Sequence, residues 1–413
     1  MKNLARIVLA VFMFSATIAL TVSCGGGGSS TSTHTHHPVP DDDAGPNDDD
    51  ASPDDDDDDD NDNDDDNDDD NDSSDDDDDD DDNDNDDNDD NDDDNDDDND
   101  DITSTLPVAV WGSSRSDVFA ASINGVVLHY DCSSWTAMPG SPLPGELWGI
   151  WGSSPSDVFA VGIETSGING AILRYDGASW SAMPGVASEL HGVWGTSPSD
   201  VFAVGGEPGA IMHYDGASWS AMPGVAELAD PLNGVWGTSS SDVFAVGAYC
   251  ANLQCYGTIL HYDGASWSAM PGITALSEDL SGIWGFSPSD VFAVGVDSPG
   301  YYGAIIRYDG ASWSAMPGVS ALSKLLLSVW GTSPSDVFAT GCYAPINYCN
   351  EGVILHYDGA SWSATPGIAA LATAIEGVWG TSPSDVFAVG EGNSNNNFSG
   401  VIFHYDGATW TAM

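Results

Sequence analysis

Basic residues are scarce in this chain. Six Lys or Arg stand against 68 Asp or Glu, which gives a formal net charge of −62. Residues 102–413 alone still carry 26 acidic side chains against four Lys or Arg. A chain with so little positive charge is repelled by phosphate backbones and by anionic surfaces. We therefore expect no nucleic acid among its partners.

Long apolar runs are also missing, apart from one at the N-terminus. Residues 7–22 are apolar, but they are too few for a comfortable membrane span, and they follow the basic residues Lys2 and Arg6. This pattern is typical of a targeting segment that is removed from the mature protein. The sequence therefore predicts a signal peptide over residues 1–23.

The end of this segment, Leu20–Cys24 (L-T-V-S-C), resembles the lipobox of bacterial lipoproteins. The resemblance implies lipid attachment at Cys24. Gly25 stands where an Asp would hold such lipoproteins at the inner membrane, so it implies an outer-membrane lipoprotein of the cell envelope, exposed at the surface. The alternative is an ordinary cleaved signal peptide and a secreted protein in which Cys24 is left over.

The next segment, residues 24–104, has too few apolar side chains to form a core. Of the 61 residues from Asp41 to Asp101, 42 are Asp and 11 are Asn. Such a composition stays disordered and repels itself, so we expect an acidic stalk that acts as a spacer. Its carboxylates would bind divalent cations only weakly and diffusely, because the EF-hand spacing with its central Gly is absent. We expect no other cofactor.

Residues 105–413 contain seven near-copies of one phrase, W-G-x-S-x-S-D-V-F-A and, after a gap, I/V-x-H/R-Y-D-x-x-x-W. The copies start 40, 43, 42, 48, 46 and 49 residues apart, and Trp148 is the one Trp of fifteen outside the pattern. A period of this length with four short strands per copy is typical of a propeller blade. The paired Trp residues are Trp111 and Trp135, Trp151 and Trp180, Trp194 and Trp219, Trp236 and Trp267, Trp284 and Trp313, Trp330 and Trp362, and Trp379 and Trp410.

The third copy illustrates the expected blade. Residues 190–194, 201–204, 210–214 and 219–222 are predicted to be short strands, separated by turns that contain Gly, Pro, Ser and Asp. Seven such copies predict an all-β fold, a seven-bladed β-propeller of four-stranded antiparallel blades. The first copy starts on an innermost strand and the last ends on an outermost strand, so we expect side-chain packing, with no shared strand, to close the ring.

Individual stretches of the repeat resemble known families. Val201–Gly206 (V-F-A-V-G-G) and the following I-M-H-Y-D resemble Kelch-type blades, although the double Gly occurs only at this one place. Asp215–Trp219 (D-G-A-S-W) resembles the Asp-box of BNR-type propellers, shortened by one residue. The whole repeat is similar to that of secreted bacterial proteins taken to be β-propellers. The resemblance implies the fold but almost nothing about activity.

One end of every expected blade varies while the other does not. The first and third turns have the same length in all seven copies, whereas the second turn has 2, 7, 3, 9, 7, 10 and 9 residues. Variable loops on a constant scaffold are typical of recognition sites, and Tyr supplies adaptable contacts there. The alternative is that these Tyr pack within their own loops. The candidate ligand-binding residues are Tyr249, Tyr256, Tyr301, Tyr302, Tyr343, Tyr348 and Phe398.

Four of the six cysteines bracket two of these variable turns. In an exported protein, Cys250 with Cys255 and Cys342 with Cys349 are expected to form local disulfides. No soft ligands lie nearby, so a metal site is not expected. Cys132 occupies the Gly position of a repeated turn, and we expect a free thiol or an intermolecular bridge there.

Repetition argues against catalysis. A residue present in every blade is spread around the ring, whereas an active site needs groups that converge. A sialidase of the BNR type would need three converging Arg, and we expect Arg115, Arg174 and Arg307 to lie apart near the constant end. His191 is the one non-repeated His of the domain, too few for a copper oxidase of the Kelch-like class.

We therefore expect a monomeric, non-catalytic binding module displayed at the cell surface and attached to the membrane only through its lipid. Its variable turns would recognise an extracellular protein or glycan. One alternative is a multivalent lectin that uses the repeated turns. Another is an enzyme similar to a glycoside hydrolase or sialidase.

Overall fold

The computed structural model describes residues 105–139, 145–184, 186–251, 254–297, 302–343, 349–394 and 397–413. The predicted signal peptide, Cys24 and the acidic stalk lie outside these residues. None of the helices in the described ranges is long and apolar enough to span a membrane.

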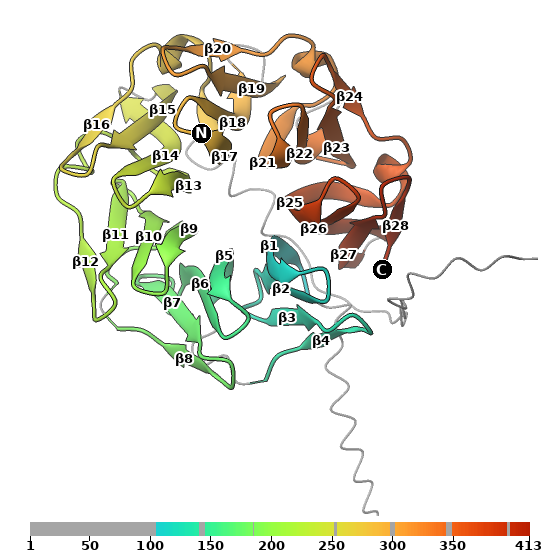
Figure 1. The fold of residues 1–413 in the computed structure, drawn as a ribbon, viewed down its shortest axis with the longest axis horizontal. Helices are drawn as coiled ribbons and strands as arrows, with labels where there is room; N and C mark the ends of the chain where they lie inside the picture. The colour runs from blue at the N-terminus through green and yellow to red at the C-terminus, as the bar shows by residue number, and fades with distance from the viewer. Residues whose placement is uncertain are drawn as a thin grey trace, which may run out of the picture. The chain divides into compact units, whose positions relative to one another are not determined.

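The described residues form seven four-stranded antiparallel sheets, each built from four consecutive strands and arranged as the blades of a ring (Figure 1). The predicted seven-bladed β-propeller is therefore confirmed. The first four blades are β1–β4 (Pro107–Ser114, Asp117–Ser122, Val127–Tyr130, Trp135–Ala137), β5–β8 (Glu146–Ser154, Asp157–Ile163, Gly170–Tyr175, Trp180–Ala182), β9–β12 (Leu190–Ser197, Asp200–Gly205, Ala210–Tyr214, Trp219–Ala221) and β13–β16 (Leu232–Ser239, Asp242–Ala251, Gln254–Tyr262, Trp267–Ala269).

Short 3-10 helices lead into the remaining three blades. These helices are η3 (Ile273–Ala275), η4 (Val319–Ala321) and η5 (Ile368–Ala370). The blades are β17–β20 (Asp279–Ser287, Asp290–Asp297, Tyr302–Tyr308, Trp313–Ala315), β21–β24 (Leu325–Ser333, Asp336–Tyr343, Glu351–Tyr357, Trp362–Ala364) and β25–β28 (Ala372–Ser382, Asp385–Ser394, Asn397–Tyr405, Trp410–Ala412).

The second strand of each blade forms the core. Val201, Phe202 and Ala203 of β10 are almost fully buried, as are their counterparts in the other blades, because each sheet lies between two neighbours. Phe202 packs against Trp194 of its own blade and Trp267 of the next. Burying one such Phe contributes about 2 kcal/mol. The V-F-A run therefore repeats because every blade interface needs it.

The first strands are longer than the sequence predicts. β9 ends at Ser197, which pairs with Asp200, so the turn contains only two residues. Gly195 lies within this strand, and a larger residue would not fit, because a Cβ there would lie 2.8 Å from the Trp151 ring of the preceding blade. The Gly of the W-G pair thus makes room for a neighbouring indole.

The ring closes by packing, as predicted. Blade 1 contributes Val110, Leu128 and Trp135 to a core cluster that also contains Phe387 and Met413 of blade 7. The sheets of blades 1 and 7 share no strand. Across the same interface the Arg115 guanidinium lies 4.0 Å from the Asp385 carboxylate.

Candidate functional site

The first and third turns of each blade lie together at one end of the ring, which we call the constant end. A Cβ on Gly216, in the third turn of blade 3, would lie 2.6 Å from the Ser199 side chain in the first turn. Gly216 has a φ of 91°, which favours glycine. Cys132 occupies the same position in blade 1 with a φ of 78°. The second turns and the blade-to-blade connections therefore lie at the opposite end, which we call the hairpin end.

A repeated ion pair holds the constant end together. In blade 3, His213 Nε2 lies 2.7 Å from Asp200 Oδ1, and the Thr196 hydroxyl donates to the other carboxylate oxygen. The His–Asp pair recurs at the same 2.7 Å distance in four more blades: His129 with Asp117, His261 with Asp242, His356 with Asp336 and His404 with Asp385.

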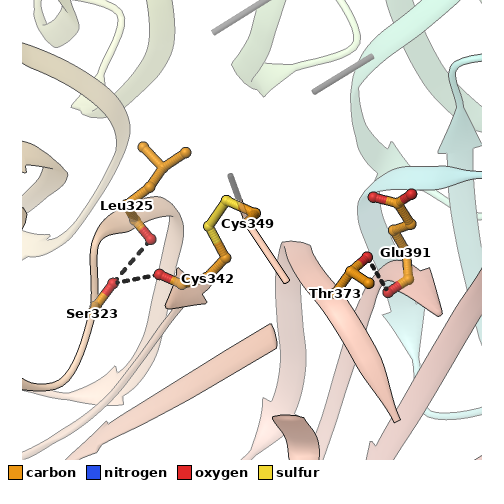
Figure 2. Close-up of a disulfide and its surroundings, with 6 residues drawn as sticks. All are labelled: Ser323, Leu325, Cys342, Cys349, Thr373 and Glu391. Carbon is orange, nitrogen blue, oxygen red and sulfur yellow. Dashed lines mark hydrogen bonds between the residues drawn. A yellow bond between two sulfur atoms is a disulfide. The ribbon is translucent and has the colours of Figure 1, made fainter. Parts of the chain in front are cut away.

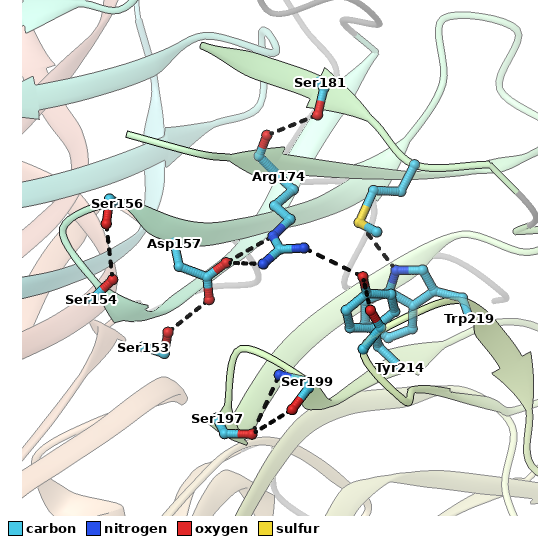
Figure 3. A network of polar contacts seen from close by, with 12 residues as sticks. Ser153, Ser154, Ser156, Asp157, Arg174, Ser181, Ser197, Ser199, Tyr214 and Trp219 are labelled. Atoms are coloured by element: carbon cyan, nitrogen blue, oxygen red, sulfur yellow. Dashed lines mark hydrogen bonds and ion pairs between the residues drawn. The ribbon is translucent and has the colours of Figure 1, made fainter. Parts of the chain in front are cut away.

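Arginine replaces the His in two blades. In blade 2, Arg174 Nε donates to Asp157 at 2.8 Å, and its Nη1 reaches the Tyr214 hydroxyl of blade 3 at 3.3 Å (Figure 3). In blade 5, Arg307 donates twice to Asp290, and this contact raises the Arg307 pKa. Together with Arg115 at Asp385, each Arg therefore pairs with the repeated Asp of a different blade. They do not converge, as predicted.

The repeated Tyr-Asp residues have a local role. Asp215 Oδ1 accepts hydrogen bonds from the backbone N–H groups of Ala217 and Ser218, at 2.9 and 2.8 Å. These hydrogen bonds, that from Ser218 first, hold the Asp215 pKa below its usual value. This geometry is that of an Asx turn, and it recurs in the other blades. These Asp residues therefore cap the backbone of their own turns.

The second Trp of the repeat also has its polar atom engaged. Trp219 Nε1 donates to the Met183 sulfur of the preceding blade at 3.4 Å, and four other blades repeat the contact. Among the described residues, the Trp135 Nε1 of blade 1 is one of two buried polar side-chain atoms without a hydrogen-bond partner. In five of the seven blades this indole N–H is therefore satisfied by the preceding blade.

The hairpin end carries the candidate ligand-binding residues. Tyr249 and Tyr256 face each other across β14 and β15, and Tyr249 is 43% exposed. Tyr302 is 40% exposed, and the Lys324 ammonium lies 3.7 Å from its ring centre. Tyr343 is half-buried at the end of β22. Tyr301, Tyr348 and the side chain of Phe398 lie outside the described residues, although the Phe398 backbone pairs within β27.

Both predicted disulfides are present at this end. Cys250 pairs with Cys255 directly across the β14–β15 ladder, and Cys342 pairs with Cys349 (Figure 2). The Ser323 hydroxyl donates to the carbonyl oxygens of Leu325 and Cys342, at 3.0 and 3.2 Å, which joins this hairpin to the preceding connection.

The prediction for Cys132 is wrong. Cys132 is disulfide-bonded, and none of the cysteines in the described ranges is a free thiol. The expectation rested on finding no second cysteine nearby in the repeat, and proximity in sequence does not limit which cysteines meet.

The exposed large hydrophobic side chains of the described residues lie at the hairpin end. Ile168 at the tip of the blade 2 hairpin is 75% exposed, and Leu371 in the connection to blade 7 is 49% exposed. With Tyr249 and Tyr302 they are the exposed large hydrophobic residues of the described chain. A shallow hollow between the blade 2 hairpin and the next connection is lined by Glu164, Asn169 and Met183, among others.

Acidic side chains outside the repeat also gather at the hairpin end. All lie in second turns, in connections or in the first residues of the inner strands, and Lys324 is the one Lys or Arg of the described chain at this end. These acids are Glu146, Glu164, Glu189, Glu207, Glu227, Asp230, Glu278, Asp279, Asp297, Glu351, Glu376 and Glu391.

Three of these carboxyl groups are strongly desolvated. Burial raises the pKa of Asp279 to about 7, although the Leu280 backbone and the Asn233 amide donate hydrogen bonds to it. Burial and the neighbouring Glu391 charge raise the pKa of Glu376 to about 7. Burial also raises the Glu391 pKa, against a hydrogen bond from Thr373.

Sequence reasoning missed these acids and the apolar tips at Ile168 and Leu371. The signal that could have found the acids is that all twelve lie outside the repeated phrase. Among the described residues, no group of three or more His, Cys, Asp or Glu is arranged to hold a metal ion.

Comparison with known proteins supports the fold alone. No protein-family model and no curated protein sequence matches the chain. The structure of YCF48 bound to D1 peptide is similar with a TM-score of 0.52 and 15% identity, covering 73% of this chain and 94% of that one. The WD40 β-propeller domain of Doa1 has a TM-score of 0.52 and 13% identity, with coverage of 73% and 93%.

Enzymes share the architecture as well. The GH74 xyloglucanase from Xanthomonas campestris has a TM-score of 0.55 and 13% identity, covering 74% of this chain and 52% of that one. At these identities the likeness carries no activity from one protein to another. The chain is a seven-bladed β-propeller, similar in fold both to binding proteins and to enzymes.

Proposed function

We propose that this protein is a non-catalytic binding module whose hairpin end recognises a basic segment of a partner protein. The main supporting observation is that exposed large apolar side chains and the acidic residues outside the repeat occupy the same end of the ring. Tyr249, Tyr302, Ile168 and Leu371 supply apolar contact area, and twelve carboxyl groups stand against one Lys. Exposed apolar patches within a charged rim are typical of protein interaction sites.

The constant end supports a scaffold role for the repeated residues. Its His, Asp, Ser and Thr side chains bond to one another, and its Trp N–H groups bond to Met sulfurs. A multivalent lectin that uses these turns would need the same polar groups for sugar hydroxyls, so this alternative has less support.

A glycan is the second candidate ligand for the hairpin end. The side chains of Tyr249 and Tyr302 are partly exposed, and aromatic rings with nearby carboxylates suit the apolar faces and hydroxyls of a sugar. The charge imbalance favours the basic protein segment, because a neutral glycan carries no positive charge that the surplus of carboxylates could attract.

The proposal extends to location. Two disulfides at exposed hairpins suit an oxidising compartment. We propose that the protein is an exported monomer of the cell envelope, in which the acidic segment 41–101 carries the propeller away from the membrane surface. A spacer of that charge would keep the acidic hairpin end clear of anionic lipids.

The test is selection from a random-peptide display library and, in parallel, a glycan array, both against the full chain. We expect Lys- and Arg-rich peptides, with binding weakened at least tenfold when Tyr249, Tyr302, Ile168 and Leu371 are all replaced by Ser. The matched control replaces four exposed constant-end residues: Ser133, Ala178, Ala217 and Ala265 become Gln. Peptide binding that depends on the control positions would contradict the proposal, and binding confined to the glycan array would favour the second candidate.

A further inference from the structure

Every inner strand carries a β-bulge at the same place. In blade 3, Leu190 pairs with Gly205 and Gly192 pairs with Val204, so His191 between them has no partner in the ladder. The same shift occurs in the other six blades. A bulge turns the extra residue out of the ladder and re-aims its side chain. We call the seven extra residues the bulge ring: Val108, Trp148, His191, Asn233, Ser281, Leu327 and Glu376.

The amino acids of the bulge ring differ from blade to blade. Its seven members are seven different amino acids, whereas the position before it is Leu in five blades, with Pro107 and Ile375 in the other two. All seven ring members are half-buried, while the residue before each is buried. A site for one ligand on a seven-fold scaffold has to break the repeat, and this position breaks it in every blade.

The bulges follow one another around the axis of the propeller. The inner strands lie nearest the centre of the ring (Figure 1), and each contacts the next. A Cβ on Gly149 would lie 2.8 Å from the His191 carbonyl oxygen of the following blade. Equivalent close approaches join Gly192 to Asn233, Gly234 to Ser281, Gly282 to Leu327 and Gly377 to Val108.

Contacts between neighbouring members already order one arc of the ring. The Trp148 and His191 rings meet edge to face with centroids 5.0 Å apart. His191 Nδ1 lies 3.0 Å from the Leu232 carbonyl oxygen, and Nε2 lies 3.8 Å from Glu189. The Asn233 amide donates to Asp279 and to the Leu280 carbonyl. The Trp148 indole therefore packs against an imidazole that is itself fixed by its own polar contacts.

The other arc presents a carboxylate without a counter-ion. Glu376 lies on the far side of Val108 from Trp148 and near the like charge of Glu391. Among the residues that the structure describes, no Lys, Arg or His forms an ion pair with Glu376. A desolvated carboxylate beside a second acid is stabilised when a cation approaches. An indole face attracts the same kind of group.

We propose that the bulge ring receives the ammonium or guanidinium group of a Lys or Arg side chain of the bound peptide, between Glu376 and Trp148. The inference rests on the proposed function and assigns it a specificity site. The hairpins would supply contact area, while the ring selects the basic side chain. The acids of the hairpin end attract such a peptide towards this point.

The test uses the full chain with tryptophan indole nitrogens labelled for NMR. The probes are the end-blocked pentapeptides Ala-Ala-Lys-Ala-Ala, its Arg counterpart and its Nε-acetyl-lysine counterpart. The Trp148 signal is assigned with W148F, and the fourteen repeated Trp signals report whether each variant is folded. We expect the Lys and Arg peptides to shift the Trp148 signal saturably and the neutral acetylated peptide to leave it unchanged.

Two variants separate the ring from general charge attraction. E376Q and the matched control E351Q each remove one carboxylate of the hairpin end, and Glu351 is exposed and outside the ring. We expect E376Q to weaken binding at least tenfold and E351Q less than twofold. The acidic segment 41–101 attracts basic peptides equally in both variants, so it does not affect the comparison.

The possible outcomes distinguish the ring site from the proposed function. Equal effects of E376Q and E351Q, or a Trp148 signal that does not move, would overturn the ring site. If library-selected peptides still bound and depended on Tyr249 and Tyr302, the proposed function would stand without it. If neither the pentapeptides nor any selected peptide bound, both proposals would fall.

Discussion

Removal of the Asp385 carboxylate should destabilise the propeller more than removal of the equivalent group in another blade. Asp385 accepts from His404 at 2.7 Å and from the Thr381 hydroxyl, and Arg115 of blade 1 lies 4.0 Å away. Its side chain is 9% exposed, against 19% for Asp242 in blade 4. Asp385 also lies at the interface between blades 1 and 7, where the ring closes.

The magnitude follows from what each substitution leaves behind. A hydrogen bond to a charged group contributes about 1.5–3 kcal/mol, and an unpaired polar group costs more as its burial increases. We therefore expect D385A to lower the free energy of unfolding by about 3 kcal/mol, and D242A by about 1.5 kcal/mol. Arg115 makes the difference larger, because its contact crosses the ring closure.

The assay is urea unfolding of the full chain, followed by tryptophan fluorescence, with both variants measured beside the parent. Equal losses for D385A and D242A would refute the argument from burial and ring closure. A loss below about 0.5 kcal/mol for D385A would refute a structural role for the repeated pair.

The sign of the pH dependence provides a second check on Asp385. Burial alone would raise its pKa, but the hydrogen bonds from His404 and Thr381 and the nearby charges of His404 and Arg115 lower it overall. A folded-state pKa below the unfolded value of about 3.8 gives stability that is present above that pH and lost as the pH falls through the folded pKa. The difference in stability between parent and D385A should therefore shrink in acid, and a difference that grew in acid would contradict the assignment.

Three further predictions concern other parts of the molecule. Burial raises the folded-state pKa of Asp279 to about 7, against 3.8 in the unfolded chain, so the free energy of unfolding should fall by at most about 4 kcal/mol between about pH 4 and pH 7. In urea unfolding measured across this pH range, the D279N variant should show a smaller pH dependence than the parent. An unchanged pH dependence would contradict the raised pKa. G195A places a methyl group 2.8 Å from the Trp151 ring and should cost about 1–3 kcal/mol in thermal unfolding, whereas a neutral result would show that the indole moves freely. Replacing Cys342 and Cys349 together by Ser should destabilise the β22–β23 hairpin by about 2.5 kcal/mol, because the reduced loop gains conformational entropy when it opens. Proteolysis between β22 and β23 should become faster, and an unchanged cleavage rate would show that the disulfide does not stabilise the hairpin.

The repeat predicts the architecture because every blade interface imposes the same requirements. The V-F-A run, the paired Trp residues and the turn Asp residues recur wherever a sheet packs against the next, so blade number and closure were both predictable. The ends of the first strands were not, because Gly195 and its counterparts read as turn residues. Their actual role is to accept the Trp of the preceding blade, and that contact lies 44 residues away in the sequence.

The candidate site was predictable only in part. The length variation of the second turns identified the hairpin end, and Tyr249 and Tyr302 are exposed there. The bulge ring was not visible, because a bulge is defined by strand pairing and the sequence shows only one more residue. Trp148 and His191 were noticed as exceptions to the repeat, but their contact with each other depends on the packing of neighbouring inner strands.

The most direct test of the binding account is amide hydrogen exchange of the full chain, with and without a saturating library-selected peptide. The account predicts slower exchange in the β14–β15 and β18–β19 hairpins and in the first residues of the inner strands. It predicts no change in the first and third turns. Protection confined to those turns, with the hairpins unaffected, would place recognition at the constant end and contradict the account.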